Sequence, residues 1–400
     1  MIKKLFDKFS GSKICVDSRK VQSGDLYCAL PGVKTHGEHF VDEALEKGAS
    51  GALVSYAYPK RGQNIIVVED VLETLQKWAR EVFKENRSCC VIGITGSLGK
   101  TTTKEFLATL LETSFNVFKT PGNANSQIGL PLAIINEFKG EEVAILEMGM
   151  TYPGQIKKLI SIAPPDYALL TKVALVHAEN FTSLAEIAKS KMEIFLHPQT
   201  KIGFYPKEME FEPLGKCLLK PFSTEDISFE KAPFKEPHLL HNLSAALSIC
   251  AELKVNVSAQ IGKLKLPSKR MEKVEKKGVL FLNDSYNAAP ESMIAALHSL
   301  PESTGKRIAI LGGMYELGQF SKESHRKVGE EALGYVDHLI CYGQECTSMA
   351  EVWKAARRPF IHLNDHAQIL GYLRELAKPG DVVLLKGSNS NKMWKIMDKY

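Results

Sequence analysis

Short apolar runs alternate with amphipathic stretches along most of this chain. In the middle of the sequence, residues 89–94, 143–146 and 167–170 are apolar on successive positions, as strands buried on both faces are. After the first of these runs, apolar side chains recur at helical spacing over residues 104–111. This alternation predicts an α/β fold with a mainly parallel sheet.

Composition shifts and turn residues predict three domains, over residues 1–87, 88–268 and 269–400. The first has helical stretches at residues 40–48 and 72–83, and polar residues 84–88 are predicted to be a linker.

The last domain is predicted to be a small parallel α/β domain with a Rossmann-like arrangement. Apolar runs at residues 279–282, 307–311, 338–341 and 381–385 are separated by helical stretches. Because the G-x-G-x-x-G pattern is missing there, no dinucleotide site is predicted.

Residues 199–237 show weak periodicity and many turn residues, and no chemistry is predicted for them. A helix is predicted to follow over residues 242–253.

Composition narrows the class of protein. The 400 residues are 44% hydrophobic, and the net charge of +5 is small. No basic run with interleaved aromatics favours nucleic acid, whereas anionic small molecules suit the charge. The eight cysteines form no C-x₂-C pair, which argues against zinc. Residues 1–8 lack a signal-peptide core and no stretch is long enough to span a membrane, so a cytoplasmic protein with reduced thiols is expected.

The sequence Thr-Gly-Ser-Leu-Gly-Lys-Thr-Thr-Thr at residues 95–103 lies between a predicted strand and a predicted helix. This layout is typical of a phosphate-binding loop, in which glycine N–H groups and the helix N-terminus surround phosphate oxygens. Lys100 would reach the terminal phosphates and Thr101 would offer its hydroxyl to Mg²⁺. The strict pattern has a glycine where Ile94 stands, and the alternative is an ordinary strand–turn–helix.

Polar side chains also follow the predicted strands at residues 143–146 and 167–170. Glu147 ends one strand, and His177 lies beyond the next. Because ligands bind at the carboxyl ends of parallel strands, we expect three strand ends to meet at one site, with Glu147 close enough to hold Mg²⁺. The alternatives are a solvated glutamate and an ordinary loop histidine. From its local sequence alone, Lys191 is predicted to be a solvated helix residue, and residues 123–125 are predicted to form a turn.

The third domain carries a polar cluster, Asn-Asp-Ser-Tyr-Asn at residues 283–287, directly after a predicted strand. It is a candidate nucleotide or substrate contact. It could also be an N-capped turn with Pro290 as the first helical residue, and both can hold at once.

Together these motifs resemble the Mur ligase family, the ATP-dependent amide-forming enzymes of peptidoglycan precursor synthesis. The resemblance covers nearly the whole chain except residues 199–237. The matching stretches are Asp17-Ser18-Arg19, residues 24–27, 95–103, 121–125 and 129–132, Glu147-Met148-Gly149, His177, Lys191, His241-Asn242, residues 284–287 and 314–318, His325, and residues 386–388. Within the family, the Ser-Tyr-Asn and Met-x-Glu-Leu-Gly stretches point to the dipeptide-adding type.

The resemblance implies a role for each domain: binding of the UDP-sugar substrate by the first, of ATP by the central, phosphate-loop domain, and ligase contacts by the last. It implies catalytic roles for Lys100, Glu147, His177 and Lys191. Thr101, Glu147, His177 and Lys191 would hold Mg²⁺, with Lys191 carbamylated. ATP would be bound by Gly96, Ser97, Gly99, Lys100, Thr101, Thr102, Asn242, Arg270, Asp284 and Asn287, and the other substrates by Ser18, Arg19, Asn123 and Asn125.

The implied reaction joins D-alanyl-D-alanine to UDP-N-acetylmuramoyl-tripeptide through an acyl phosphate. ATP is the co-substrate, no nucleic acid takes part, and a monomer is expected. Two alternatives stay open: a related ligase with another acceptor, such as a folylpolyglutamate or third-residue type, and a nucleotide-binding scaffold without catalysis. Departures from the family pattern motivate the scaffold, at Asn283, Ala289, Gly313, Asn389, Ser126 and Ala245.

Overall fold

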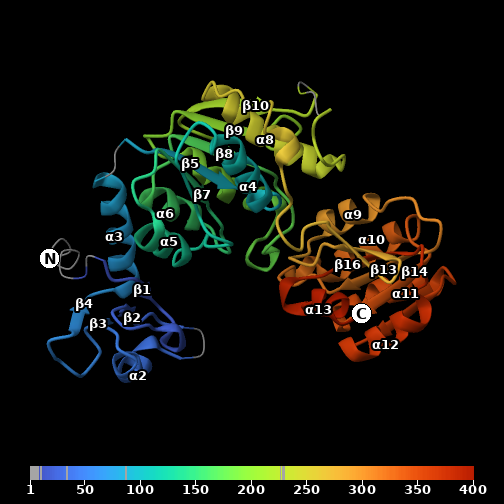
Figure 1. Cartoon of the computed structure of the whole chain (residues 1–400), viewed down its shortest axis with the longest axis horizontal. Helices are drawn as coiled ribbons and strands as arrows, with labels where there is room; N and C mark the ends of the chain where they lie inside the picture. The colour runs from blue at the N-terminus through green and yellow to red at the C-terminus, as the bar shows by residue number, and fades with distance from the viewer. Residues whose placement is uncertain (1–8, 10, 33–34, 86–87, 226, 228–229) are drawn as a thin grey trace.

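The computed structural model describes residues 9, 11–32, 35–85, 88–225, 227 and 230–400. The expectation for residues 1–8 therefore lies outside the described residues. The described chain contains three separate sheets. They lie along an arch, with the first and third sheets at its two ends and the second between them (Figure 1). The predicted α/β class and three-domain organisation are confirmed.

The first sheet has four strands in the order β1-β2-β3-β4, and every neighbouring pair is parallel. Helix α3 packs on helix α5 of the second part of the molecule, so it links the first two sheets. The elements are β1 (Ile14–Cys15), η1 (Ser18–Lys20), β2 (Leu26–Cys28), η2 (Gly37–Phe40), α2 (Val41–Glu46), β3 (Gly51–Ser55), β4 (Ile65–Val68) and α3 (Val71–Glu85).

The second sheet has the order β10-β9-β8-β5-β7-β6, again with parallel neighbours only. Strand β5 lies between β8 and β7, which places the loop after β5 in the middle of the carboxyl edge. The elements are β5 (Cys90–Thr95), α4 (Lys100–Leu111), β6 (Val117–Lys119), α5 (Gly129–Glu137), β7 (Val143–Glu147), α6 (Gln155–Ile162), β8 (Tyr167–Leu170), η3 (Ala178–Asn180), α7 (Leu184–Met192), η4 (Glu193–Phe195), β9 (Ile202–Pro206), β10 (Leu218–Phe222), α8 (Pro237–Glu252) and η5 (Ile261–Lys263).

The third sheet has the order β11-β12-β16-β13-β14-β15, and only the β11–β12 pair is antiparallel. The elements are β11 (Glu272–Lys276), β12 (Val279–Asn283), α9 (Pro290–His298), β13 (Arg307–Gly312), η6 (Gly318–Phe320), α10 (Ser321–Ala332), β14 (His338–Tyr342), η7 (Gln344–Cys346), α11 (Thr347–Ala355), β15 (Phe360–Leu363), α12 (His366–Leu376), β16 (Val382–Lys386), η8 (Asn389–Asn391) and α13 (Trp394–Lys399).

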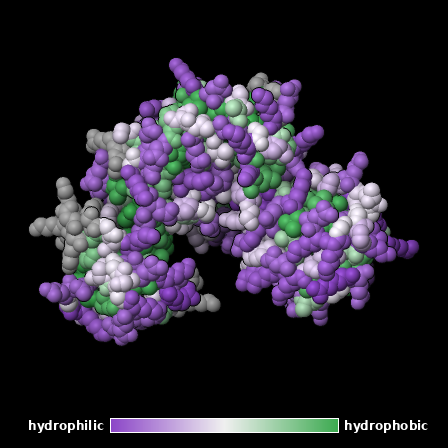
Figure 2. Space-filling model, viewed as in Figure 1, coloured by the Kyte–Doolittle hydropathy of each residue, from purple (hydrophilic) through white to green (hydrophobic). Residues whose placement is uncertain are grey.

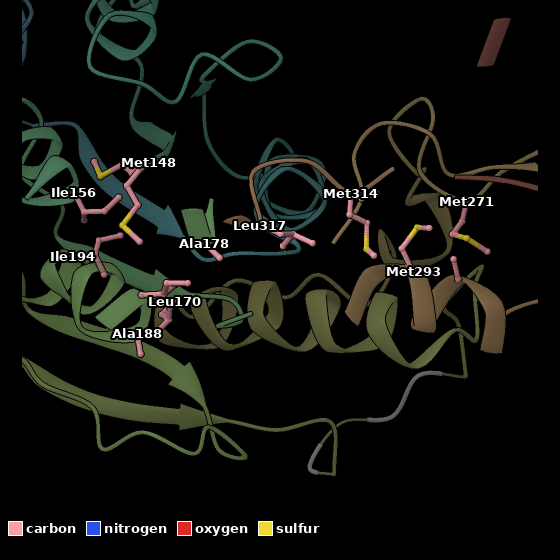
Figure 3. Close-up of a cluster of buried hydrophobic side chains, with 14 of the residues drawn as sticks. Met148, Ile156, Leu170, Ala178, Ala188, Ile194, Met271, Met293, Met314 and Leu317 are labelled. Atoms are coloured by element: carbon pink, nitrogen blue, oxygen red, sulfur yellow. The ribbon is translucent and has the colours of Figure 1, made fainter. Parts of the chain in front are cut away.

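Apolar packing is continuous between the second and third sheets. One buried cluster contains Ala178, Leu170 and Met148 from the second part together with Met314 and Leu317 from the third. Figure 3 shows Ala178 and Leu317 where these two groups meet. The outer surface over the third sheet is largely hydrophilic (Figure 2). No helix in the described part of the chain combines the length and apolarity needed to cross a membrane.

The structure differs in detail from what the sequence indicates in three segments. Residues 199–237 contain β9 and β10, which complete one side of the second sheet. Helix α8 begins at Pro237, five residues before the expected start, because proline is well suited to the first turn of a helix. The expected linker at residues 84–88 begins inside α3, and residues 86–87 lie outside the description.

Candidate active site

A cavity of about 640 Å³ lies between the second and third parts of the molecule. The start of α4, the end of β7, the start of α8, the segment before β11 and the loop between β12 and α9 all line it. Most of the sequence-predicted site residues line this cavity: Ser97, Gly99, Lys100, Thr101, Thr102, Asn123, Asn125, Glu147, His177, Asn242, Arg270, Asp284 and Asn287. The predicted meeting of three strand ends is therefore confirmed.

Four predicted site residues do not line this cavity. Gly96 begins the phosphate loop but does not face the cavity, Lys191 is buried in α7, and Ser18 and Arg19 belong to the first domain. The structure thus separates a nucleotide-sized cavity from the candidate UDP-sugar contacts.

Glycine is required at both ends of the phosphate loop. A Cβ on Gly96, whose φ is 146°, would lie 2.0 Å from Oγ1 of Thr171. A Cβ on Gly99, whose φ is 86°, would lie 2.2 Å from Oδ1 of Asn242. Ile94, the departure from the strict pattern, is fully buried in β5 and does not form the turn. The loop can therefore keep its shape without a glycine at that position.

The loop is also held by the segment after β8. The Ser97 N–H donates to the Lys172 carbonyl at 2.6 Å, and its hydroxyl donates to the Ala174 carbonyl at 2.8 Å. The Thr171 hydroxyl is 2.6 Å from the Leu98 carbonyl. These contacts fix the backbone N–H groups that would surround a phosphate before any ligand arrives.

Lys100 is folded over its own loop. Its Nζ donates to the carbonyls of Gly96 at 2.6 Å and Ser97 at 3.2 Å. Burial lowers the pKa of Lys100, and the charge of Glu147 only partly opposes this effect. Phosphate oxygens bound in the loop would place negative charge beside this ammonium group and would stabilise its charged form.

Glu147 is the centre of a polar network at the end of β7. One carboxylate oxygen accepts from the Thr101 hydroxyl at 2.8 Å and the other from the Asn125 amide at 2.7 Å. Glu147 is only 2% exposed, and its backbone N–H donates to Oγ1 of Thr120 at 3.0 Å. The solvated-glutamate alternative is therefore wrong.

Lys104 is a component of this network that sequence analysis missed. Its side chain is completely buried, and Nζ donates to the Thr120 carbonyl at 2.6 Å and the Gly122 carbonyl at 2.8 Å. The same nitrogen is 3.7 Å from a carboxylate oxygen of Glu147. A signal existed in the sequence, because residue 104 shares a helix face with the buried Leu107, Ala108 and Leu111.

Lys191 is not the solvated helix residue that its sequence context alone indicates, because it is only 2% exposed. Burial, followed by the positive charge of Lys100, holds the pKa of Lys191 well below the usual lysine range. Burial also lowers the pKa of His177, and the charges of Lys100 and Lys191 add to that effect while Glu316 opposes it. His177, Lys100 and Lys191 thus influence one another electrostatically.

The third domain contributes the charged residues Arg270 and Asp284 to the lining of the cavity. Asp284 accepts from the Met271 N–H at 3.1 Å and from Nζ of Lys386 at 2.5 Å. The Arg270 guanidinium lies 4.0 Å from the centre of the Tyr286 ring, where a cation–π interaction stabilises it. Asp284 therefore contacts the segment that carries Arg270, and Pro290 begins α9 as predicted.

Sequence analysis also left Lys386 and His238 out of the site, although both line the cavity. His238 is in the first turn of α8, and burial lowers its pKa. The signal for Lys386 was its place at the end of the predicted strand 381–385, the same criterion that selected Glu147.

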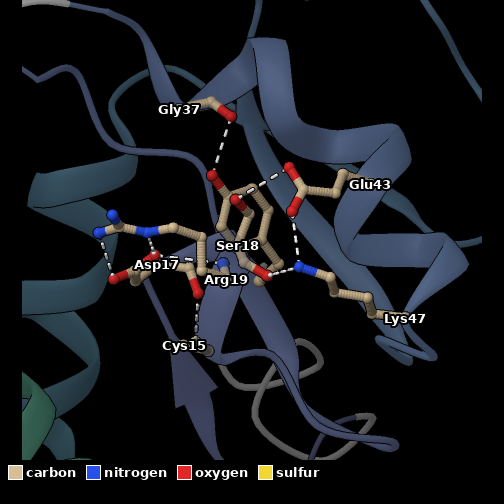
Figure 4. A network of polar contacts seen from close by, with 8 residues as sticks. Cys15, Asp17, Ser18, Arg19, Gly37, Glu43 and Lys47 are labelled. Atoms are coloured by element: carbon tan, nitrogen blue, oxygen red, sulfur yellow. Dashed lines mark hydrogen bonds and ion pairs between the residues drawn. The ribbon is translucent and has the colours of Figure 1, made fainter.

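The first domain forms its own polar network around Ser18 (Figure 4). The Ser18 hydroxyl is 3.3 Å from a carboxylate oxygen of Glu43, which also pairs with Lys47 at 2.6 Å. Arg19 is exposed and pairs with Asp17 at 2.8 Å, and this hydrogen bond lowers the pKa of Asp17 to about 2.

The first turn of α4 and the end of β7 together fit a divalent cation. Thr101 and Glu147 present a hydroxyl and a carboxylate oxygen 2.8 Å apart, and Mg²⁺ prefers oxygen ligands. The described residues contain no group of three or more His, Cys, Asp or Glu arranged to hold a metal. A Mg²⁺ ion at this site would therefore take further ligands from phosphate oxygens and water, as such ions commonly do.

Three segments of the chain match models of known domains. Residues 12–82 match the Mur ligase family catalytic domain, residues 94–235 the Mur ligase middle domain, and residues 269–389 the Mur ligase glutamate ligase domain. The UDP-N-acetylmuramoyl-tripeptide–D-alanyl-D-alanine ligase of Bacillus subtilis is 30% identical over 420 residues, which cover 96% of this chain and 92% of that protein. The chain belongs to the Mur ligase family.

Other comparisons agree with this membership. The ligase of the same name from Treponema pallidum is 31% identical over 418 residues, which cover 94% of this chain and 91% of that protein. The MurF ligase of Thermotoga maritima, solved in complex with ADP, is 32% identical with a TM-score of 0.84 and covers 98% of this chain and 97% of that one. MurF from Acinetobacter baumannii is 25% identical with a TM-score of 0.87, covering 97% and 92%.

Escherichia coli FolC, solved with DHPP and ADP, shares only the fold, at 17% identity and a TM-score of 0.62 over 81% of this chain and 92% of that one. This Mur ligase is therefore more similar to MurF structures than to the folylpolyglutamate alternative.

Proposed function

We propose that this Mur ligase joins D-alanyl-D-alanine to UDP-N-acetylmuramoyl-tripeptide, at the expense of ATP, in peptidoglycan precursor synthesis. The observation that carries the proposal is the cavity in which the phosphate loop and Glu147 face Arg270 and Asp284 of the third domain. Relatives that are named for this activity align with nearly the whole chain. ATP is the proposed co-substrate because the Thermotoga maritima structure contains ADP.

We assign the phosphates of ATP to the loop. Gly96, Ser97, Gly99 and Thr102 would supply backbone contacts and Lys100 the charge. Asn242, Arg270, Asp284 and Asn287 would contact the rest of the nucleotide. Asn242 packs against Gly99, and Arg270 faces the cavity from the opposite side.

We assign one Mg²⁺ to Thr101 and Glu147, with His177 and Lys191 contributing to a second. When bound, Mg²⁺ neutralises charge on the phosphates and aligns the transferring group. Lys191 suits carbamylation because burial holds its pKa well below the usual lysine range, so more of its amine is neutral and able to attack CO₂ than in an exposed lysine. Formation of the N–C bond with loss of a proton gives a carbamate, which replaces a cation by an anionic oxygen ligand.

The reaction proceeds in two transfers. A carboxylate oxygen of the tripeptide attacks the γ-phosphorus of ATP, the bond to the β-phosphate oxygen breaks, and an acyl phosphate and ADP form. The amine of D-alanyl-D-alanine then attacks the acyl carbon, and inorganic phosphate leaves with loss of a proton from the amine. Lys100 stabilises the charge on the transferring group, and the third domain covers the site so that water does not hydrolyse the acyl phosphate.

We assign the UDP-sugar to the first domain through Ser18 and Arg19, and the remaining substrate contacts to Asn123 and Asn125. We propose domain boundaries at residues 1–87, 88–268 and 269–400. A single copy suffices for the reaction because one chain builds the whole cavity, so we propose a monomer. A reaction that consumes ATP is expected in the cytoplasm.

The test is phosphate release from Mg²⁺-ATP with UDP-N-acetylmuramoyl-tripeptide and a panel of acceptors. The proposal expects release that requires D-alanyl-D-alanine and yields the pentapeptide. Release that requires glutamate or diaminopimelate instead would favour a ligase with another acceptor. ATP binding without acceptor-dependent release would favour the scaffold.

A further inference from the structure

A loop of the third domain reaches the turn that carries His177. This docking loop, residues 313–318, joins β13 to η6, and it meets the turn at residues 177–180 of the second domain. The Glu316 carbonyl accepts from the Glu179 N–H at 3.0 Å, and a carboxylate oxygen of Glu316 is in direct contact with Nδ1 of His177. The two domains are thus joined next to a proposed metal ligand.

The contact is packed like a protein interior. Leu317 is 2% exposed and Ala178 is 1% exposed, and both belong to the cluster shown in Figure 3. A Cβ on Gly318 would lie 2.8 Å from Cα of Glu179, and the φ of this glycine is 54°. Only glycine therefore allows the docking loop to approach the turn this closely.

The docking loop is rigidly supported from its own domain. The fully buried His325 accepts from the Met314 N–H through Nε2 at 2.9 Å and donates from Nδ1 to the Ser321 carbonyl at 2.8 Å. The Tyr315 N–H donates to Oγ of Ser388 at 3.0 Å. A loop held in this way moves with the third domain as one unit.

Both residues of this contact have unusual backbones. The φ of His177 is 55° and that of Glu316 is 62°, a left-handed conformation that is uncommon for residues other than glycine. Such conformations persist where the surrounding structure enforces them, and they concentrate at functional sites. The backbone contact and the packing of Gly318 supply that enforcement.

We propose that Glu316 is a positioning residue that orients His177 for metal binding only when the third domain is docked. The inference rests on the proposed function, because it takes His177 as a ligand. A carboxylate on one ring nitrogen of a histidine fixes the tautomer and the ring orientation, and leaves the other nitrogen for the metal. Here that carboxylate comes from another domain, so docking of the third domain completes the site.

The test compares Glu316→Gln with Glu351→Gln, which removes the same charge from an exposed position on α11. ADP binding is measured by calorimetry over a series of Mg²⁺ concentrations, and turnover is measured separately. Glu316→Gln should raise the Mg²⁺ concentration required for ADP binding and lower kcat, each by about 10–100-fold. Its thermal unfolding should match that of Glu351→Gln, because both side chains are partly exposed.

A second variant, Gly318→Ala, tests docking itself. The added Cβ should push the docking loop off the turn, increase the radius of gyration in solution X-ray scattering, and raise the Mg²⁺ requirement as Glu316→Gln does. If Glu316→Gln behaves like Glu351→Gln in both Mg²⁺ requirement and kcat, the proposal is overturned. If the wild-type protein shows no turnover, the proposed function is refuted instead. The ADP titration and the solution scattering would still test the role of Glu316 in that case.

Discussion

The buried Nζ of Lys104 lies 3.7 Å from a carboxylate oxygen of Glu147. Lys104 lies in α4, the helix that follows the phosphate loop, and Glu147 is the last residue of β7, which pairs with β5. The lysine therefore places a fixed positive charge beside the carboxylate proposed to hold Mg²⁺. It also ties the loop that carries Asn123 and Asn125, through the carbonyls of Thr120 and Gly122, to the same helix.

Replacing Lys104 by methionine should destabilise the fold by about 3 kcal/mol, because it leaves the buried Glu147 without its cation. Addition of Mg²⁺ should restore part of the loss, since the ion supplies the missing charge. Thermal and urea unfolding with and without Mg²⁺ measure both effects. The exposed Lys189→Met is the control, and equal stability of the two variants would contradict this role for Lys104.

Alanine at Gly99 should weaken ADP binding at least about tenfold, or about 1.4 kcal/mol, because its Cβ would displace the Asn242 side chain. Gly154→Ala is a matched control. Gly154 also precedes a helix, its φ of 82° is close to the 86° of Gly99, and no atom lies within 4 Å of its added Cβ. Both variants should carry the left-handed strain of about 1–2 kcal/mol, but calorimetry should find lost affinity only for Gly99→Ala. Similar affinities would show that the Asn242 contact is unimportant.

Lys191 should form a carbamate with CO₂. Burial depresses the pKa of its amine in the folded protein, so a larger fraction is neutral than in an exposed lysine, and the yield of carbamate should rise with pH as more of the amine loses its proton. With ¹³C-labelled bicarbonate, NMR should show a carbamate carbon in the wild type and in Lys189→Arg but not in Lys191→Arg. Activity should fall in CO₂-depleted buffer and recover with bicarbonate. A spectrum in which Lys191→Arg keeps the signal would assign the carbamate elsewhere.

The phosphate loop and the meeting of the strand ends could be predicted because they depend on local pattern and on the geometry of parallel sheets. Strand β5, the glycines and Lys100 are adjacent in sequence. Glu147 ends β7 and His177 follows β8, and these two strands flank β5, so sheet topology brings both residues to the loop.

Other features depend on tertiary contacts that the local sequence does not encode. Lys191 and the exposed Lys189 lie in the same short helix, and only packing distinguishes them. Strand β10 was missed because it is an edge strand, with exposed Leu218 and a proline at position 221 that would not suit a central strand. The pairing of His177 with Glu316 joins two domains, so no local pattern indicates it.

The most direct test of the account follows the oxygen atoms of the tripeptide. UDP-N-acetylmuramoyl-tripeptide labelled with ¹⁸O in its terminal carboxylate is converted with ATP, Mg²⁺ and D-alanyl-D-alanine, and the released phosphate is analysed by mass spectrometry. Activation of the carboxylate by phosphoryl transfer predicts one ¹⁸O in each phosphate, and no phosphate from Lys100→Ala. Unlabelled phosphate released in step with pentapeptide formation would contradict the acyl-phosphate route and, with it, the role assigned to this cavity.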